Sequence, residues 1–118
     1  MAAETRQVGI GNTVTLEQVV LDDIIKRIVE TAQPERIILF GSAARGEMGP
    51  HSDVDLLIIR EGGHSRKLVG RIYRKLHGVS AAVDAVMVSP ADVERYRDSH
   101  ALIIKPALAE GRVIYDAS

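Results

Sequence analysis

Two short apolar runs joined by a brief connection constrain the fold of this chain more than any other feature of its sequence. Residues 36–40 (R-I-I-L-F) and 54–59 (V-D-L-L-I-I) are rich in β-branched and aliphatic side chains, which predicts two strands. The connection, residues 41–52, is too short for the full helix that joins parallel neighbours, although it has room for one helical turn. We therefore expect the two strands to be antiparallel neighbours in one sheet.

Helical periodicity accounts for much of the rest of the chain. Residues 15–18 (T-L-E-Q) have the form of a capping box. Apolar residues then recur every four positions on one stripe, at Leu16, Val20, Ile24 and Ile28. This pattern predicts an amphipathic helix that ends before Pro34. A second apolar stripe in residues 65–77, with Gly78 just beyond it, predicts a capped helix.

The C-terminal half continues the alternation of strands and helices. Residues 79–88 predict a third strand, and Ser89 with Pro90 opens a further helix as N-cap and first helical residue. Residues 101–110 are also expected to be helical, and residues 112–115 to form a last short strand. The order α-β-β-α-β-α-α-β implies an α+β fold, in which a mixed β-sheet is flanked by helices.

Length and composition favour a single domain. The chain has 118 residues, of which 46% are hydrophobic and 26% charged, and this suits one globular core. Residues 1–13 are polar or glycine-rich and show no period, so we expect a flexible arm there and one domain over residues 14–118. The sequence has no cysteine, no apolar leader and no run of about 18 apolar residues. These features predict a cytoplasmic protein without membrane contact.

The charge and aromatic content argue against nucleic acid as a partner. Fifteen cations and sixteen anions give a net charge of −1, so there is no global positive field to hold DNA or RNA. Aromatic residues make up 3% of the chain, so the stacking platforms used by many single-strand binders are mostly missing.

Two aspartates at the start of the second strand carry the strongest chemical signal. Asp53 and Asp55 are separated by one residue, and alternation along a strand sends both carboxylates to the same face of the sheet. Adjacent negative charges repel each other unless a cation lies between them. Mg²⁺ takes one or two protein carboxylates and completes its shell with water and phosphate oxygens. We therefore expect Asp53 and Asp55 to bind Mg²⁺ together with a phosphate-bearing ligand.

A phosphate-binding loop is expected directly upstream of these aspartates. Gly41 leaves the first strand without a side chain, so a phosphate can approach the backbone, and Ser42 offers a hydroxyl and an amide donor. A helical turn over residues 43–46 would add free N–H groups. Arg45 could contact a triphosphate or brace the loop through a carboxylate. This is not a Walker A loop, because Gly46 is followed by glutamate instead of lysine.

Asp84 is a third acidic candidate, because it interrupts the apolar run of residues 81–88. Burying a lone carboxylate costs on the order of several kcal/mol unless something pairs with it. A shared metal site would supply that partner, and three carboxylates could hold two Mg²⁺ ions about 3.5 to 4 Å apart. A basic side chain on a neighbouring helix is the structural alternative.

The spacing within residues 41–55 is G-S, ten residues, then D-V-D. It resembles the G-S-x10-D-x-D signature of the minimal nucleotidyltransferases of the DNA polymerase β superfamily. The flanking segments 39–46 and 52–56 and the ending 110–115 (E-G-R-V-I-Y) resemble the same family. The resemblance therefore extends over most of residues 15–115 and implies a polymerase β-like nucleotidyltransferase fold.

This resemblance also assigns roles to single residues. It implies that Gly41 and Ser42 contact the triphosphate of the nucleotide. Asp53, Asp55 and Asp84 would be the catalytic and metal-binding carboxylates, with Mg²⁺ as cofactor.

Stand-alone chains of this size resemble the antitoxin of HEPN–MNT toxin–antitoxin pairs, in which the transferase moves AMP from ATP onto a tyrosine of its partner ribonuclease. Larger relatives carry an added helical domain that helps to bind the acceptor, and this chain lacks one. The resemblance thus implies a protein adenylyltransferase with ATP as substrate and a HEPN-family protein as partner. The nucleotide, the acceptor and the oligomeric state stay open.

Two other functions are compatible with the sequence. The chain could be a catalytically vestigial binding module that neutralises its partner sterically, or a transferase acting on a small molecule or an RNA end. One feature favours a transferase that acts on a small molecule or an RNA end. It is a set of five cations on one predicted helix: Arg66, Lys67, Arg71, Arg74 and Lys75. These cations could dock an acidic partner, RNA or the nucleotide, but a solvated helix face is the simpler interpretation. His51 is expected to be a surface loop residue without a function, and the three tyrosines are expected to be structural.

Overall fold

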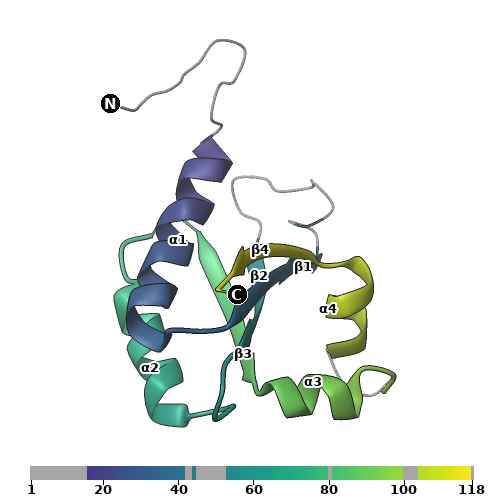
Figure 1. Ribbon diagram of the computed structural model, residues 1–118. Helices are drawn as coiled ribbons and strands as arrows, with labels where there is room; N and C mark the ends of the chain where they lie inside the picture. Colours follow the sequence, from purple (N-terminus) through teal and green to yellow (C-terminus); the bar gives the residue numbers. More distant parts are fainter. Residues whose placement is uncertain (1–15, 42–43, 45–52, 80, 100–103, 118) are drawn as a thin grey trace.

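Four strands form one sheet in the part of the chain that the structure describes, and two described helices cover each of its faces. The computed structural model describes residues 16–41, 44, 53–79, 81–99 and 104–117. The helices are α1 (Leu16–Ala32), α2 (Arg66–Lys75), α3 (Pro90–Tyr96) and α4 (Ile104–Glu110) (Figure 1). The strands are β1 (Arg36–Phe40), β2 (Asp53–Ile59), β3 (Ala82–Val88) and β4 (Arg112–Asp116). This order of elements confirms the predicted one.

The sheet has the strand order β3-β2-β1-β4. Strand β1 is antiparallel to both of its neighbours, β2 and β4, which confirms the pairing expected from the short connection. Strands β2 and β3 are parallel and are joined through α2, as a parallel pair requires. The sheet is therefore mixed, and the predicted α+β class is confirmed.

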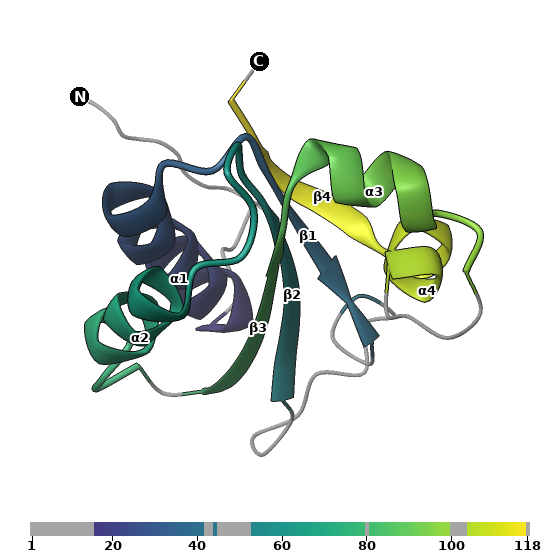
Figure 2. The same ribbon diagram turned by 90° about the horizontal axis from the view of Figure 1, so that it is seen from below.

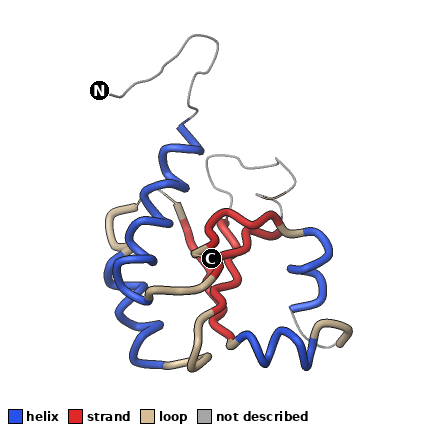
Figure 3. Tube along the Cα trace, in the orientation of Figure 1, coloured by secondary structure: helices blue, strands red, loops and turns tan. Residues whose placement is uncertain are grey.

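Strand alternation divides the core into two layers. Helices α1 and α2 pack on one face of the sheet and α3 and α4 on the other (Figures 2 and 3). The α1/α2 face receives one set of strand residues: Ile37, Leu39, Val54, Leu56, Ile58 and Met87. The α3/α4 face receives the alternate set: Ile38, Phe40, Leu57, Ile59, Val86 and Val88. The face on which a side chain lies therefore follows from its position in the strand.

Helix α1 buries the apolar stripe that the sequence predicted. Ile24 and Ile28 are fully buried, and complete burial of such a side chain contributes about 1.5 to 3 kcal/mol. The helix ends at Ala32, and Gln33 then adopts a left-handed conformation with φ of 48° before Pro34. The predicted helix end before Pro34 is confirmed.

Helix α2 is held at both ends. The Ser65 hydroxyl accepts a hydrogen bond from the Leu68 N–H at 3.2 Å, and this caps the N-terminus. At the other end, the Arg27 guanidinium of α1 donates to the carbonyls of Lys75 at 2.7 Å and His77 at 3.3 Å. These bonds satisfy carbonyls that a helix end leaves without partners.

Strand β3 begins at Ala82, three residues later than the predicted start at residue 79. The Val79 N–H bonds to the Leu76 carbonyl at 3.0 Å, so the chain at this point still belongs to the turn that closes α2. The β-branched side chain of Val79 resembles a strand residue in sequence, but a local hydrogen bond decides its conformation.

Helix α3 starts with the capping box expected at Ser89. The Asp92 carboxylate accepts the Ser89 N–H at 3.1 Å, and the Ser89 hydroxyl accepts the Asp92 N–H at 3.0 Å. Hydrogen bonds from Ser89 lower the pKa of the Asp92 carboxyl below its ordinary value of 3.8. A carboxyl whose pKa falls on folding stabilises the protein above its unfolded pKa, and this stabilisation is lost as the pH falls through the folded pKa.

Asp92→Ala is therefore expected to lower the Tm at pH 7 by about 2 to 6 °C, and this difference should shrink as the pH falls below about 3.8. Thermal melts of both proteins at neutral and acidic pH measure it. Asp98→Ala, which removes an exposed carboxylate outside the cap, is the control. An equal loss of Tm at every pH would contradict the electrostatic part of this interpretation.

Some of the predicted segments lie partly or wholly outside the described residues. The arm expected at residues 1–13 and the first three residues of the helix expected at 101–110 lie outside them. Helix α4 begins at Ile104, and β4 extends one residue beyond the predicted 112–115. Among the described helices, none combines the length and apolar character needed to cross a bilayer.

Candidate active site

The structure places the three predicted carboxylates on the same face of the sheet. Val54 and Leu56 are buried against α1 and α2, so the alternate residues of β2, Asp53 and Asp55, lie on the α3/α4 face. Asp84 is the register partner of Asp55 in the parallel neighbour β3, and it lies on the same face. The three residues are thus grouped where β2 and β3 begin.

Asp55 lies at the centre of this group. On the α3/α4 face it is flanked by its register partners, Phe40 in β1 and Asp84 in β3. Asp55 is partly buried, whereas Asp53 and Asp84 are exposed. The apolar contacts of α3 and α4 cover the other part of this face, around Ile59. The carboxylate end is therefore accessible.

The expected burial of the Asp84 carboxylate is wrong. The sequence predicted a carboxylate buried in an apolar run, but Asp84 is exposed because β3 is an edge strand of the sheet. Within the described residues, no basic side chain forms an ion pair with it. Asp84 is thus explained by neither burial nor pairing, and its position beside Asp55 is what makes it a candidate.

The carboxylates affect one another electrostatically. Partial burial raises the pKa of the Asp55 carboxyl above its ordinary value of 3.8, and the negative charges of Asp84 and Asp53 raise it further. The ionised form of Asp55 is therefore destabilised, as expected for like charges held close together. A cation between the carboxylates would relieve this repulsion.

Gly41 brings the start of the predicted phosphate loop against Asp55. Its φ of 74° lies in the left-handed region, and a Cβ atom at this position would overlap Asp55 Oδ2 and lie 3.3 Å from Asp55 Cγ. The Ala44 N–H bonds to the Gly41 carbonyl at 3.1 Å, which closes one turn of the connection. Only glycine fits here without moving the carboxylate.

The rest of the predicted loop cannot be placed. Ser42 and Arg45, expected to contact the triphosphate, lie outside the described residues, as does His51. Among the residues that are described, no three acidic or histidine side chains already surround a common point suitable for a metal ion. Mg²⁺ needs only one or two protein carboxylates, so the donor set of Asp53, Asp55 and Asp84 fits its preference for oxygen ligands.

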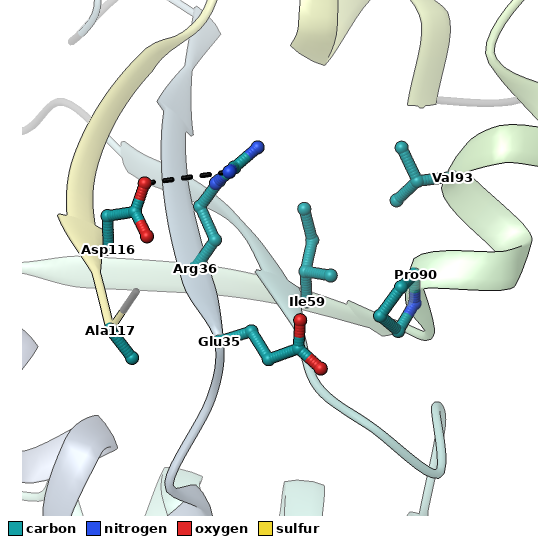
Figure 4. A pocket seen from close by; sticks show the side chains of 7 residues that line it. All are labelled: Glu35, Arg36, Ile59, Pro90, Val93, Asp116 and Ala117. Atoms are coloured by element: carbon teal, nitrogen blue, oxygen red, sulfur yellow. Dashed lines mark ion pairs between the residues drawn. The ribbon is translucent and has the colours of Figure 1, made fainter.

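A hollow of about 490 Å³ lies at the opposite end of the sheet (Figure 4). It is lined by Glu35, Arg36, Ile59, Pro90, Val93, Asp116 and Ala117. On one side of it, the Arg36 guanidinium of β1 pairs with the Asp116 carboxylate of β4 at 3.5 Å. None of the predicted site residues contributes to this hollow. This hollow is therefore separate from the candidate site, where Asp53 and Asp84 are exposed and Asp55 is partly buried.

One residue near the site was not singled out by the sequence. The hydroxyl of Tyr73 in α2 accepts a hydrogen bond from the N–H of Ala85, the residue after Asp84, at 2.9 Å. Tyr73 thereby ties α2 to the strand that carries Asp84. No sequence pattern indicates this bond, because it depends on how α2 packs beside β3.

Comparisons with known proteins identify the family of this chain. Residues 22–118 match the family model described as "Polymerase beta, Nucleotidyltransferase". A stretch of 56 residues, 45% of this chain, is 41% identical to the bifunctional uridylyltransferase/uridylyl-removing enzyme of Burkholderia thailandensis. The matched stretch spans 6% of that enzyme's length.

Several solved structures share the fold at low sequence identity. A chain of a toxin–antitoxin complex crystallised with AMP-PNP has a TM-score of 0.62 and 18% identity over 82% of this chain and 73% of its own length. A chain of a mutant MntA–HpeT toxin–antitoxin complex has a TM-score of 0.61 and 16% identity over the same shares. A candidate nucleotidyltransferase from Sulfolobus solfataricus has a TM-score of 0.54 and 16% identity over 84% of this chain and 79% of its own. Since the family match extends over most of the sequence, the chain belongs to the polymerase β-type nucleotidyltransferase family.

Proposed function

We propose that this protein is a Mg²⁺-dependent nucleotidyltransferase that moves AMP from ATP to a hydroxyl group. We further propose that the acceptor is a tyrosine of a HEPN-type toxin, so that the chain acts as an antitoxin. The observation that carries the proposal is the juxtaposition of Gly41 with Asp55 on a face that also holds Asp53 and Asp84. A phosphate-binding turn and a cation-binding group of carboxylates meet there.

Each group has a distinct role in this proposal. The backbone at Gly41 and the hydroxyl of Ser42 bind the triphosphate, and Arg45 adds a positive charge to it. Asp53, Asp55 and Asp84 would hold two Mg²⁺ ions, which neutralise phosphate charge and favour ionisation of the attacking hydroxyl. The absence of a side chain at Gly41 leaves room for a phosphate oxygen beside Asp55.

The transfer is a single displacement at phosphorus. The acceptor oxygen forms a bond to the α-phosphorus, and the bond from that phosphorus to the oxygen bridging the α- and β-phosphates breaks. Pyrophosphate leaves with the electron pair of this bond. The acceptor's proton passes to the Asp84 carboxylate, which is exposed and can release it to water. The products are the AMP ester of the acceptor and pyrophosphate.

Three observations support ATP and a protein acceptor. One structural neighbour was crystallised with AMP-PNP, an analogue of ATP. That neighbour and another belong to toxin–antitoxin complexes. Finally, Asp53 and Asp84 are exposed, so an acceptor on the surface of another protein can reach them. The HEPN identity of the partner rests on the resemblance of this chain to antitoxins of that type.

The direct test is transfer of label from ATP. The purified chain is incubated with Mg²⁺, α-³²P-ATP and a purified HEPN-type protein, and the products are analysed by gel and by mass spectrometry. We expect label on a tyrosine of the partner and none from γ-³²P-ATP. Absence of transfer would overturn the proposed function. Because one relative is a uridylyltransferase, UTP is tested in parallel, and a preference for UTP would overturn the choice of AMP.

Binding of Mg²⁺ can be tested without measuring activity, through its effect on the Tm. Mg²⁺ with a non-hydrolysable ATP analogue should raise the Tm of the wild-type chain by about 3 °C or more, because it binds the folded state and relieves repulsion at Asp55. The shift should vanish in Asp53→Asn/Asp55→Asn and persist in Asp98→Asn. Equal shifts in all three proteins would contradict the metal assignment.

A further inference from the structure

We infer that the exposed face of α2 is a docking surface for an acidic segment of a partner protein. This inference goes beyond the proposed function, since it concerns a surface on the far side of the sheet and holds whether or not a nucleotide is transferred. We call this surface the basic face and define it by five residues of α2: Arg66, Lys67, Arg71, Arg74 and Lys75.

The basic face carries positive charge that forms no ion pair within the part of the chain that the structure describes. All five cations are exposed, and α2 contains no acidic residue. Within the described ranges, no carboxylate lies within 4.0 Å of any of them. Cations elsewhere do have acidic partners, such as Asp23 for Arg27 at 3.1 Å and Glu94 for Arg97 at 3.2 Å. The basic face is therefore available to an external anion.

The charge of the whole chain is strongly segregated. Of its fifteen cations, five lie on the ten-residue helix α2, and the other residues hold ten cations and sixteen anions. The helix thus has a charge of +5, in a chain of net charge −1. Such segregation orients a charged partner toward one face of the molecule.

The basic face also lines a hollow. A concavity of about 530 Å³ lies between α1 and α2, and it is lined by Arg71, Arg74 and Lys75 with Glu30 and Thr31 of α1. Three cations and one carboxylate thus border a recess that a short chain segment could enter. A recess distinguishes this part of the helix from a convex, merely solvated face.

The cations are presented on a rigid support. Ile72, between the exposed positions of α2, is buried in the core. The C-terminus of α2 is tied to α1 by the two hydrogen bonds from Arg27. A partner would therefore meet side chains on a helix that is already ordered, which lowers the entropic cost of binding.

The location of the basic face separates it from the candidate active site. Helix α2 packs on the α1/α2 face, whereas Asp53, Asp55 and Asp84 lie on the α3/α4 face of the same sheet (Figure 2). Helix α2 and the three carboxylates therefore lie on opposite faces of the sheet. A partner bound to α2 leaves the carboxylate face accessible.

Two observations favour a protein segment over a nucleic acid. Glu30 in the hollow would repel a continuous phosphate backbone but can pair with a basic residue of a mixed-charge peptide. The ten residues of α2 span about 15 Å, which suits a short segment, and the chain outside α2 is net negative and would repel a long polyanion. The occupant is thus expected to be acidic, with a cation opposite Glu30.

The test uses the full chain and two probes of equal net charge. One probe is a fluorescein-labelled peptide of repeated Glu-Glu-Lys units, and the other is a labelled single-stranded oligouridylate. At low ionic strength we expect the peptide to bind and added salt to weaken binding. Arg71→Glu/Arg74→Glu should weaken peptide binding about tenfold or more, whereas the control Arg95→Glu/Arg112→Glu, with the same change in net charge, should change it less than about twofold.

Several outcomes would overturn the inference. These are no salt-dependent binding of the peptide, an equal loss in both double variants, or oligouridylate binding as tight as or tighter than that of the peptide. Thermal melts establish that each variant is folded. If the charge reversal unfolds the chain, Arg71→Gln/Arg74→Gln takes its place with a smaller expected loss. None of these measurements depends on nucleotidyl transfer, so the result is separate from the test of the proposed function.

Discussion

Asp53→Asn/Asp55→Asn is expected to abolish nucleotidyl transfer, with a loss of at least about 10³-fold, while the protein stays folded. An asparagine amide offers one neutral oxygen in place of an anionic carboxylate, so the two positions lose their capacity to hold Mg²⁺. The fold should tolerate the change because Asp53 is exposed, and because the pKa of Asp55 is raised by burial and by neighbouring negative charge. Removing that repulsion should leave the Tm of the metal-free chain unchanged or higher.

The measurement compares the rate of AMP transfer and the Tm of the variant with those of a matched control. Glu61→Gln/Asp98→Asn also removes two negative charges, but at exposed positions away from the site. This control should retain full activity. Full activity in Asp53→Asn/Asp55→Asn would refute the site. Neutralisation of the toxin that persists without transfer would instead favour a binding module that acts sterically.

Gly41→Ala is expected to reduce transfer by about 100-fold or more. The added Cβ would overlap the Asp55 carboxylate, and a shift of a catalytic group by about 1 Å can cost a factor of about 10² in rate. The left-handed φ of 74° adds a backbone cost of about 1 to 2 kcal/mol in stability. The loss of activity should therefore exceed what the loss of stability explains.

Gly78→Ala separates these two effects. Gly78 also has a left-handed φ, of 92°, but a Cβ atom there would meet nothing within 4 Å. Both variants should lose similar free energy of unfolding in denaturant titrations, and only Gly41→Ala should lose transfer. Equal activity of the two variants would mean that contact between Gly41 and Asp55 is irrelevant to the reaction.

Most of the fold could be predicted because its signals are local. The short connection between β1 and β2 dictated antiparallel pairing, the stripe through Ile24 and Ile28 defined α1, and Ser89 defined the start of α3. The start of β3 was misplaced because a hydrogen bond from Val79 back to Leu76 extends the turn after α2. The strand propensity of Val79 gives no indication of this hydrogen bond.

The site was predictable in part for the same reason. The spacing of Asp53 and Asp55 within one strand places both carboxylates on one face, and the structure agrees. Asp84 was predicted to be buried, but it is exposed. Its exposure depends on β3 being an edge strand, which the sequence does not show. The contact of Gly41 with Asp55 and the bond from Ala85 to Tyr73 join different elements of the fold, so only the three-dimensional structure reveals them.

The bond between Tyr73 and Ala85 has a consequence for how this chain meets other chains. An edge strand offers unpaired N–H groups to which a strand of another molecule can add, and this is a common route to aggregation. In β3 the Ala85 N–H already donates to the Tyr73 hydroxyl at 2.9 Å, so an added strand would have to displace a side chain that is 41% exposed. The strand that carries Asp84 is thereby protected against sheet extension while its carboxylate stays open to solvent.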